Sequence, residues 1–244
     1  MTLVLLTAAV TPSVGGVTVS NADERLRQYQ EALMAWSTQA DAADFDLAIV
    51  ETTGAEPRHL FKQLPEGLRK RITFVPFEPA EADIHRGKGA IERSAVHAAL
   101  RAVSPREDEA VYKCTGRLVV SNAARVIQHL EPASVRVRMT IDRSWADSRL
   151  FGASADVWFE HLMRSTVEVS DPDGVEYERV LAADIAFGLA ARSFTLSRFP
   201  ERPLFDGVSG TTGQRYSPTL SRSRAAVLHW FEISLSGLAA RKQA

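Results

Sequence analysis

Basic side chains stand beside glycine at two points of the sequence. Lys88 lies between two glycines, and in the stretch YKCTGR the residues Lys113 and Arg117 enclose Thr115-Gly116. Lysine supplies a positive point charge, and arginine can hold a phosphate with two parallel hydrogen bonds. Glycines let an anion approach backbone N–H groups, especially where a helix begins. These residues therefore predict an anion site, with a pair of solvated surface cations as the alternative.

The elements that must position these residues alternate along the first half of the chain. Apolar runs and helical periodicity predict strands at 2–10, 45–54, 71–77 and 109–120, helices at 20–40, 57–64, 90–103 and 122–130, and a polar loop at 78–89. Such alternation is typical of an α/β fold whose mostly parallel sheet has helices on both faces. Ligands of these sheets bind outside the carboxyl ends of the strands. We therefore expect one binding site to contain Thr7, Glu51, Lys88, Lys113, Thr115, Gly116 and Arg117.

The second half of the chain is less regular. It predicts strands at 135–142 and 149–154, helices at 155–164 and 177–194, a turn at 171–174, and a closing helix with Val227, Leu228, Phe231 and Leu235 inward. A long loop at about 197–218 contains Ser209, Gly210 and Thr211, which could close over a ligand as a lid. A flexible connector is the alternative. Because no repeat or linker interrupts the sequence, residues 1–244 are expected to form one domain.

The composition excludes several classes of protein. A formal net charge of −1 over 244 residues gives no overall field that would attract nucleic acid or anionic lipid. The single cysteine, Cys114, excludes an internal disulfide framework and suits a reducing cytoplasm. The apolar start has no basic flank and no stretch reaches the length of a membrane span, so we expect a cytoplasmic protein. Contact with a membrane surface stays open.

Familiar catalytic motifs are missing from the sequence. No Walker loop, no Gly-x-Gly-x-x-Gly after the first strand, no Gly-x-Ser-x-Gly elbow and no His-Glu-x-x-His are present. No stripe of aromatic and basic residues suggests nucleic-acid binding. The strand ends with their cations remain as the strongest signal.

Seven segments occur in a characteristic order: NADERLRQYQEAL, IVETTG, GKGAIE, YKCTGRLVVSN, ADSRLFGA, DGVEYERVL and FDGVSGTTGQRY. This ordered set resembles a family of bacterial GT-A-type glycosyltransferase-like proteins found with surface polysaccharide genes. The resemblance covers most of the chain. It implies a nucleotide-sugar donor and a glycan or lipid-linked hydroxyl acceptor in polysaccharide assembly. It also implies that residues 1–130 bind the nucleotide sugar and residues 131–244 form the acceptor side.

The sequence departs from the wider GT-A pattern at the diphosphate. Those enzymes usually carry Asp-x-Asp, which holds a divalent metal, where this chain has KCTGR. The two Asp-x-Asp matches here are Asp44–Asp46, at the wrong end of a strand, and Asp171–Asp173, in a turn. We therefore expect no metal and no other cofactor. The cations of KCTGR, with Lys88, would neutralise the leaving diphosphate instead.

Glycosyl transfer also needs a base for the acceptor proton, or a nucleophile. Asp147 and Glu178 are the candidates, and Arg149 beside Asp147 is a candidate substrate-binding residue. A salt bridge or a helix-start carboxylate is the alternative for each acid. Two other functions stay open at this point. One is a nucleotidyltransferase, which would release pyrophosphate, and the other is a catalytically silent nucleotide-binding assembly protein.

Overall fold

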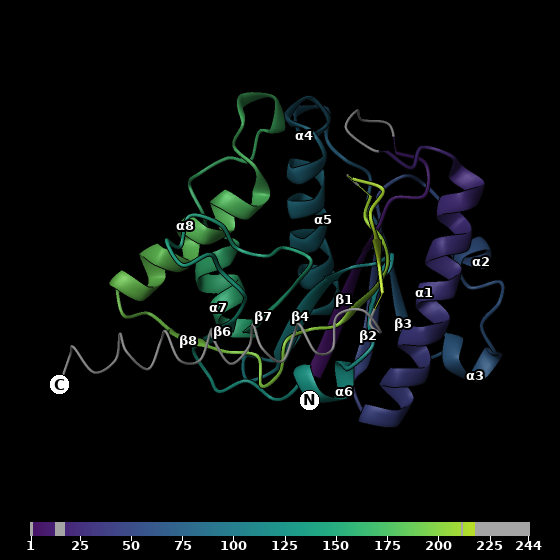
Figure 1. Cartoon of the computed structure of the whole chain (residues 1–244), viewed down its shortest axis with the longest axis horizontal. Coiled ribbons are helices and arrows are strands. Elements are labelled where there is room, and N and C mark those ends of the chain that lie inside the picture. The colour runs from purple at the N-terminus through teal and green to yellow at the C-terminus, as the bar shows by residue number, and fades with distance from the viewer. Residues whose placement is uncertain (1, 13–17, 211, 218–244) are drawn as a thin grey trace.

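The computed structural model describes residues 2–12, 18–210 and 212–217. Its centre is a seven-stranded sheet of order β3-β2-β1-β4-β7-β6-β8 (Figure 1). The first four of these strands are parallel, whereas β7 runs antiparallel to β4 and β6. The mostly parallel α/β sheet is therefore confirmed. The strands are β1 (Thr2–Ala8), β2 (Asp46–Glu51), β3 (Ile72–Pro76), β4 (Ala110–Thr115), β6 (Ser134–Arg136), β7 (Leu150–Ser154) and β8 (Thr195–Ser197).

Helices cover both faces of the sheet, α1 on one side of β1 and α5 on the other (Figure 1). Successive side chains of a strand point to opposite faces, so the apolar run of β1 serves two cores. Val4 and Leu6 pack in the core of α1, and Leu3 and Leu5 in the core of α5 and α8. The helices are α1 (Ala22–Ala43), α2 (Pro57–Leu60), α3 (Glu66–Arg69), α4 (Glu81–Arg86), α5 (Lys88–Val103), α6 (Ala123–Val126), α7 (Ala155–Val157) and α8 (Tyr177–Ala190).

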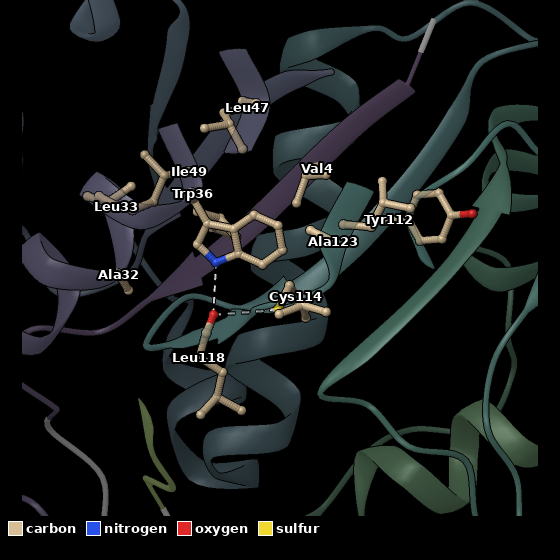
Figure 2. Close-up of a cluster of buried hydrophobic side chains, with 14 of the residues drawn as sticks. Val4, Ala32, Leu33, Trp36, Leu47, Ile49, Tyr112, Cys114, Leu118 and Ala123 are labelled. Carbon is tan, nitrogen blue, oxygen red and sulfur yellow. Dashed lines mark hydrogen bonds between the residues drawn. The ribbon is translucent and has the colours of Figure 1, made fainter. Parts of the chain in front are cut away.

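Trp36 fixes α1 against the strands. Its buried indole Nε1 donates a hydrogen bond to the carbonyl oxygen of Leu118 at 2.8 Å (Figure 2). The thiol of Cys114 shares this carbonyl at 3.8 Å. Burial raises the pKa of Cys114 to about 12. A thiol with this pKa is not a nucleophile at neutral pH, and Cys114 is a residue of the core.

Several element boundaries differ from the sequence-based prediction. The polar loop at 78–89 contains α4, and the helix at 122–130 is only the single turn α6. The helix at 155–164 is the short α7 followed by a π-helical turn, Trp158–Leu162. The closing helix with Val227, Leu228, Phe231 and Leu235 lies outside the described residues. Within them, no helix combines the length and the apolar composition that crossing a bilayer requires.

The single strand expected at 109–120 is two strands in different sheets. β4 ends at Thr115, and β5 (Leu118–Val120) joins a second sheet of order β10-β9-β5. Its other members, β9 (Phe205–Val208) and β10 (Arg215–Tyr216), lie inside the segment expected to be a loop. Gly116 makes the break: its N–H donates to the carbonyl of Thr7 at 2.9 Å, and a Cβ there would lie 2.5 Å from that oxygen. Gly116 is therefore required for a close approach of backbones.

His97 on α5 is expected to make the stability of the protein depend on pH. Burial lowers the pKa of His97 to about 4, and repulsion from Arg93 and Arg101 adds to the shift. The folded pKa is below the unfolded value, so protonation favours unfolding. We expect His97 to leave the free energy of unfolding unaffected above about pH 6.5. Protonation of His97 in the unfolded chain should then lower this free energy by about 2–3 kcal/mol as the pH falls towards 4. The measurement is the free energy of unfolding in urea at pH 7.5 and 4.5 for the wild type and His97→Gln. An equal loss in both proteins would exclude His97 as the cause.

Candidate functional site

A pocket of about 170 Å³ opens at the carboxyl ends of β1 and β4. The order of the sheet reverses here, since β2 and β3 lie on one side of β1 and β4 on the other. Ligands of open α/β sheets bind at such a point. Eight of the site residues predicted from the sequence line this pocket: Thr7, Lys88, Thr115, Arg117, Arg149, Glu178, Ser209 and Gly210. Thr211 lies outside the described residues.

Arg117 is the best-placed cation for binding an anion. It is only 4% exposed, and its Nη1 donates to the side-chain oxygen of Gln28 at 2.9 Å. Its buried Nε has no hydrogen-bond partner among the described residues. Gly210 packs so closely that a Cβ there would collide with Nη2. A buried charged donor without a partner is costly, and the chain keeps the charge of Arg117 at the wall of the pocket in spite of that cost.

Arg25 adds a second buried positive charge beside Arg117. Both guanidinium carbons lie 5.9 Å from the centre of the Tyr29 ring. Arg25 donates to the carbonyl oxygens of Ala9, with Nε at 2.7 Å, and Val19, with Nη1 at 3.1 Å. Burial lowers the pKa of Arg25, and the charge of Arg117 lowers it further. Arg25 therefore fixes the chain that follows β1 and contributes charge to the pocket.

Arg149 lines the pocket and is held by Asp147. Its Nε and Nη2 donate to the two carboxylate oxygens of Asp147 at 2.8 and 2.7 Å. Its guanidinium lies over the rings of Phe205 and Tyr216, 4.7 and 5.3 Å from their centres. The hydrogen bonds that Arg149 donates to Asp147 raise the pKa of Arg149 above its ordinary value. Asp147 is not among the lining residues, so the structure places this catalytic candidate behind Arg149 rather than in the pocket.

The sequence predicts that Lys113 faces the same opening as Arg117, and this placement is wrong. Lys113 is 0% exposed and does not line the pocket. Its Nζ lies 2.6 Å from Oε1 of Glu92 and donates to the carbonyl oxygen of Ser148 at 2.7 Å. Alternation along β4 turns Lys113 towards α5, whereas Arg117 follows the turn at Gly116.

Glu92 on α5 also lines the pocket, and it is not among the site residues predicted from the sequence. Its Oε1 accepts a hydrogen bond from the hydroxyl of Thr7 at 2.9 Å and also forms the ion pair with Lys113. Burial raises the pKa of Glu92, but the charges of Lys113 and Lys88 outweigh burial, so the pKa lies below its ordinary value. Glu92 is therefore an ionised carboxylate that lines the pocket.

Glu178 stands in the first turn of α8 and lines the same pocket. Its Oε1 accepts a hydrogen bond from the hydroxyl of Ser148 at 2.6 Å. Because Ser148 is bound through its carbonyl to Lys113, one connected network orients both carboxylates that line the pocket. Of the two catalytic candidates, Glu178 is the one that can reach a ligand.

Glu51 shapes the loops after β1 and β2 instead of facing the pocket. It is 1% exposed, and its carboxylate accepts hydrogen bonds from the backbone N–H groups of Val10, Thr53 and Ala55. Its neighbours Thr52 and Thr53 line the pocket in its place. The structure therefore does not place Glu51 among the residues that line the pocket, although the sequence predicts it in the binding site.

The glycine-flanked helix start at Lys88 is already occupied by an acid of the chain itself. The backbone N–H of Gly89 donates to Oδ2 of Asp171 at 3.0 Å. A Cβ on Gly87 would lie 2.7 Å from the same carboxylate. The expected anion site at this helix N-terminus is therefore wrong, and Lys88 contributes to the pocket through its side chain only. Across the described residues, no group of three or more His, Cys, Asp or Glu side chains could hold a metal ion.

No protein-family model and no curated protein matches this sequence. Solved structures with a loose likeness include the galactosyltransferase LgtC bound to donor and acceptor sugar analogues, at 13% identity and TM-score 0.47, covering 80% of this chain and 72% of that one. An active-site mutant of LgtC matches at 12% identity and TM-score 0.44, with coverage of 80% and 72%. A candidate nucleotide-diphospho-sugar transferase of Desulfovibrio desulfuricans G20 matches at 13% and 0.43, with coverage of 81% and 79%. At this level of likeness no functional residue is carried over.

Proposed function

We propose that this chain is a glycosyltransferase that moves a sugar from a nucleotide-sugar donor to a hydroxyl acceptor. The observation that carries the proposal is the buried guanidinium of Arg117, whose Nε has no hydrogen-bond partner among the described residues, beside a pocket at the reversal point of the sheet. Arg25, Lys88 and Arg149 add positive charge around it. The order of sequence motifs that resembles GT-A-type proteins supports the choice of a sugar nucleotide among phosphate-containing ligands. On that resemblance we place the reaction in cytoplasmic polysaccharide assembly.

The geometry suits the departure of a diphosphate. As the bond between the sugar carbon and the phosphate oxygen breaks, its electron pair moves to the diphosphate, where fixed cations stabilise the charge. A hydroxyl of the acceptor forms the new bond to the sugar carbon and gives its proton to Glu178, which Ser148 holds in place. The role of the cations leads us to propose that the reaction needs no metal ion.

Nucleoside diphosphates are expected to stabilise the protein equally with and without EDTA. The thermal-shift panel consists of UDP, GDP, ADP and dTDP and their hexose conjugates. We expect the ligands of one base to raise Tm by about 5–10 °C at a ligand concentration of 100 times Kd. Fixed guanidinium groups would bind that diphosphate without a bridging cation. A shift that needs manganese or magnesium would overturn metal independence. Absence of any shift would overturn the function itself.

A catalytically silent nucleotide-binding protein is the second candidate. One observation favours it: Asp147 is paired with Arg149 and does not line the pocket, so Glu178 is the one of the two predicted catalytic acids that lines it. Turnover separates the two functions. In the enzyme, Glu178→Gln should bind nucleotide normally and lose release of nucleoside diphosphate in the presence of an acceptor. A silent protein would show no release in the wild type, and release of pyrophosphate would indicate a nucleotidyltransferase.

A further inference from the structure

The pocket carries opposite charges on its two sides. Arg25 and Arg117 pack beside Tyr29, and Arg149 packs on Phe205 and Tyr216, all rings of the core between α1 and the sheet. We call these three arginines the arginine side. Glu92 and Glu178 project from α5 and α8, whose apolar faces form the other core, and we call them the carboxylate side. Lys88 also lies on α5, where its charge attracts Glu92. A ligand that fills this pocket must offer an anionic group at one end and hydrogen-bond donors at the other.

The carboxylate of Glu92 is built to stay ionised while it remains accessible. Its side chain is 17% exposed, whereas Lys113 beneath it is 0% exposed. The hydrogen bond from Thr7 and the contact with Lys113 both go to Oε1. An ionised carboxylate accepts hydrogen bonds at both oxygens and donates none. Glu92 can therefore accept further bonds from donors in the pocket.

We propose that Glu92 binds hydroxyl groups of the donor's sugar. This inference rests on the proposed function, which puts the diphosphate on the arginine side. The sugar is the group joined to that diphosphate, and its hydroxyls are neutral donors whose hydrogen bonds gain strength from a charged acceptor such as a carboxylate. A site built around a buried polar group discriminates sharply against a ligand that leaves this group unpaired. Glu92 therefore selects for the sugar and not for the nucleotide.

Lys113 acts in this scheme as a positioning residue. Its ammonium holds Glu92 on one side and the carbonyl of Ser148 on the other, and the hydroxyl of Ser148 bonds to Glu178. One buried cation thus sets the separation of the two carboxylates. The same arrangement explains why a lysine is fully buried beside the pocket without lining it.

The test compares two affinities within each protein, so that a general effect on folding cancels. Calorimetry measures Kd for the nucleoside diphosphate that binds most tightly and for its hexose conjugate, for example UDP with UDP-glucose and UDP-galactose. The proteins are the wild type, Glu92→Gln and, as matched control, Glu66→Gln. Glu66 stands on α3, and its exposed carboxylate pairs with Lys70, the residue after that helix. Glu92→Asp is the second variant. The shorter side chain keeps a negative charge near Lys113 and draws the carboxylate back from the pocket.

Each result decides between the possibilities. We expect both Glu92 variants to bind the diphosphate within about threefold of the wild type and the sugar nucleotide about tenfold or more weakly, with the control unchanged. Equal weakening of both ligands, or no weakening of the sugar nucleotide, would overturn the role of Glu92 and leave the proposed function standing. A wild type that binds neither ligand would overturn the proposed function as well.

Discussion

Arg117→Met is expected to weaken binding of the nucleoside diphosphate by about 100-fold or more. Two charge-assisted hydrogen bonds from one guanidinium account for an effect of this size. The free energy of unfolding should change little, because the variant also removes a buried donor that has no partner among the described residues. Affinity by calorimetry and stability by urea unfolding are measured on the same samples. A large loss of binding with stability preserved is the signature of a residue held for its ligand.

Arg58→Met is the matched control for this variant. Arg58 is 72% exposed at its side chain, pairs with Glu56, and lies outside the pocket. It should leave both affinity and stability unchanged, since exposed ion pairs contribute little. If Arg117→Met binds the diphosphate as well as Arg58→Met does, the anion site is elsewhere. If it unfolds readily instead, Arg117 is a structural cation and the proposed function loses its main support.

The sequence was sufficient to predict the strands β1 to β4 of the central sheet and the edge at which the pocket opens. Continuous apolar runs are typical of buried parallel strands, and polar residues after them mark the ligand-binding edge. Thr7, Thr115 and Arg117 were located in this way. Periodicity also predicted α1 and α5, because their buried residues repeat with the helical period. These features depend on local pattern, which a sequence contains in full.

The contacts that the sequence could not predict join residues far apart in the chain. Glu92 reads as an ordinary polar residue of a helix, and only packing of α5 on the sheet brings it to Thr7, 85 positions away. Asp171 reads as a turn residue, yet it caps α5 at Gly89, 82 positions away. The apolar run through Leu118 looks like a continuation of β4, and the break at Gly116 follows from the nearby backbone of β1. Tertiary packing decides each of these.

Lys113→Met is expected to lower the free energy of unfolding at pH 7 by about 3–5 kcal/mol, the usual cost of breaking a buried ion pair. The variant leaves the carboxylate of Glu92 without its partner at 2.6 Å. Urea unfolding at pH 7 gives the loss directly. The double variant Lys113→Met/Glu92→Gln removes both charges and should recover most of the lost free energy of unfolding. Replacing both members of a buried ion pair costs far less than removing one member and leaving the other charge unpaired.

The effect of pH on this variant follows from Glu92. In the wild type the pKa of Glu92 lies below its ordinary value of about 4.5, so its contribution to stability is present above that pH and lost as pH falls. Without Lys113, only the charge of Lys88 and the hydrogen bond from Thr7 oppose burial. We expect burial to prevail and to raise the pKa of Glu92 above its ordinary value, so that the folded variant takes up a proton more readily than the unfolded chain does. The penalty is then greatest at neutral pH and is relieved as pH falls. The stability difference between the wild type and Lys113→Met should therefore narrow steadily from pH 7 to about pH 4.5. A difference that stays constant over this range would mean that lost packing around Lys113, and not the charge of Glu92, causes the instability.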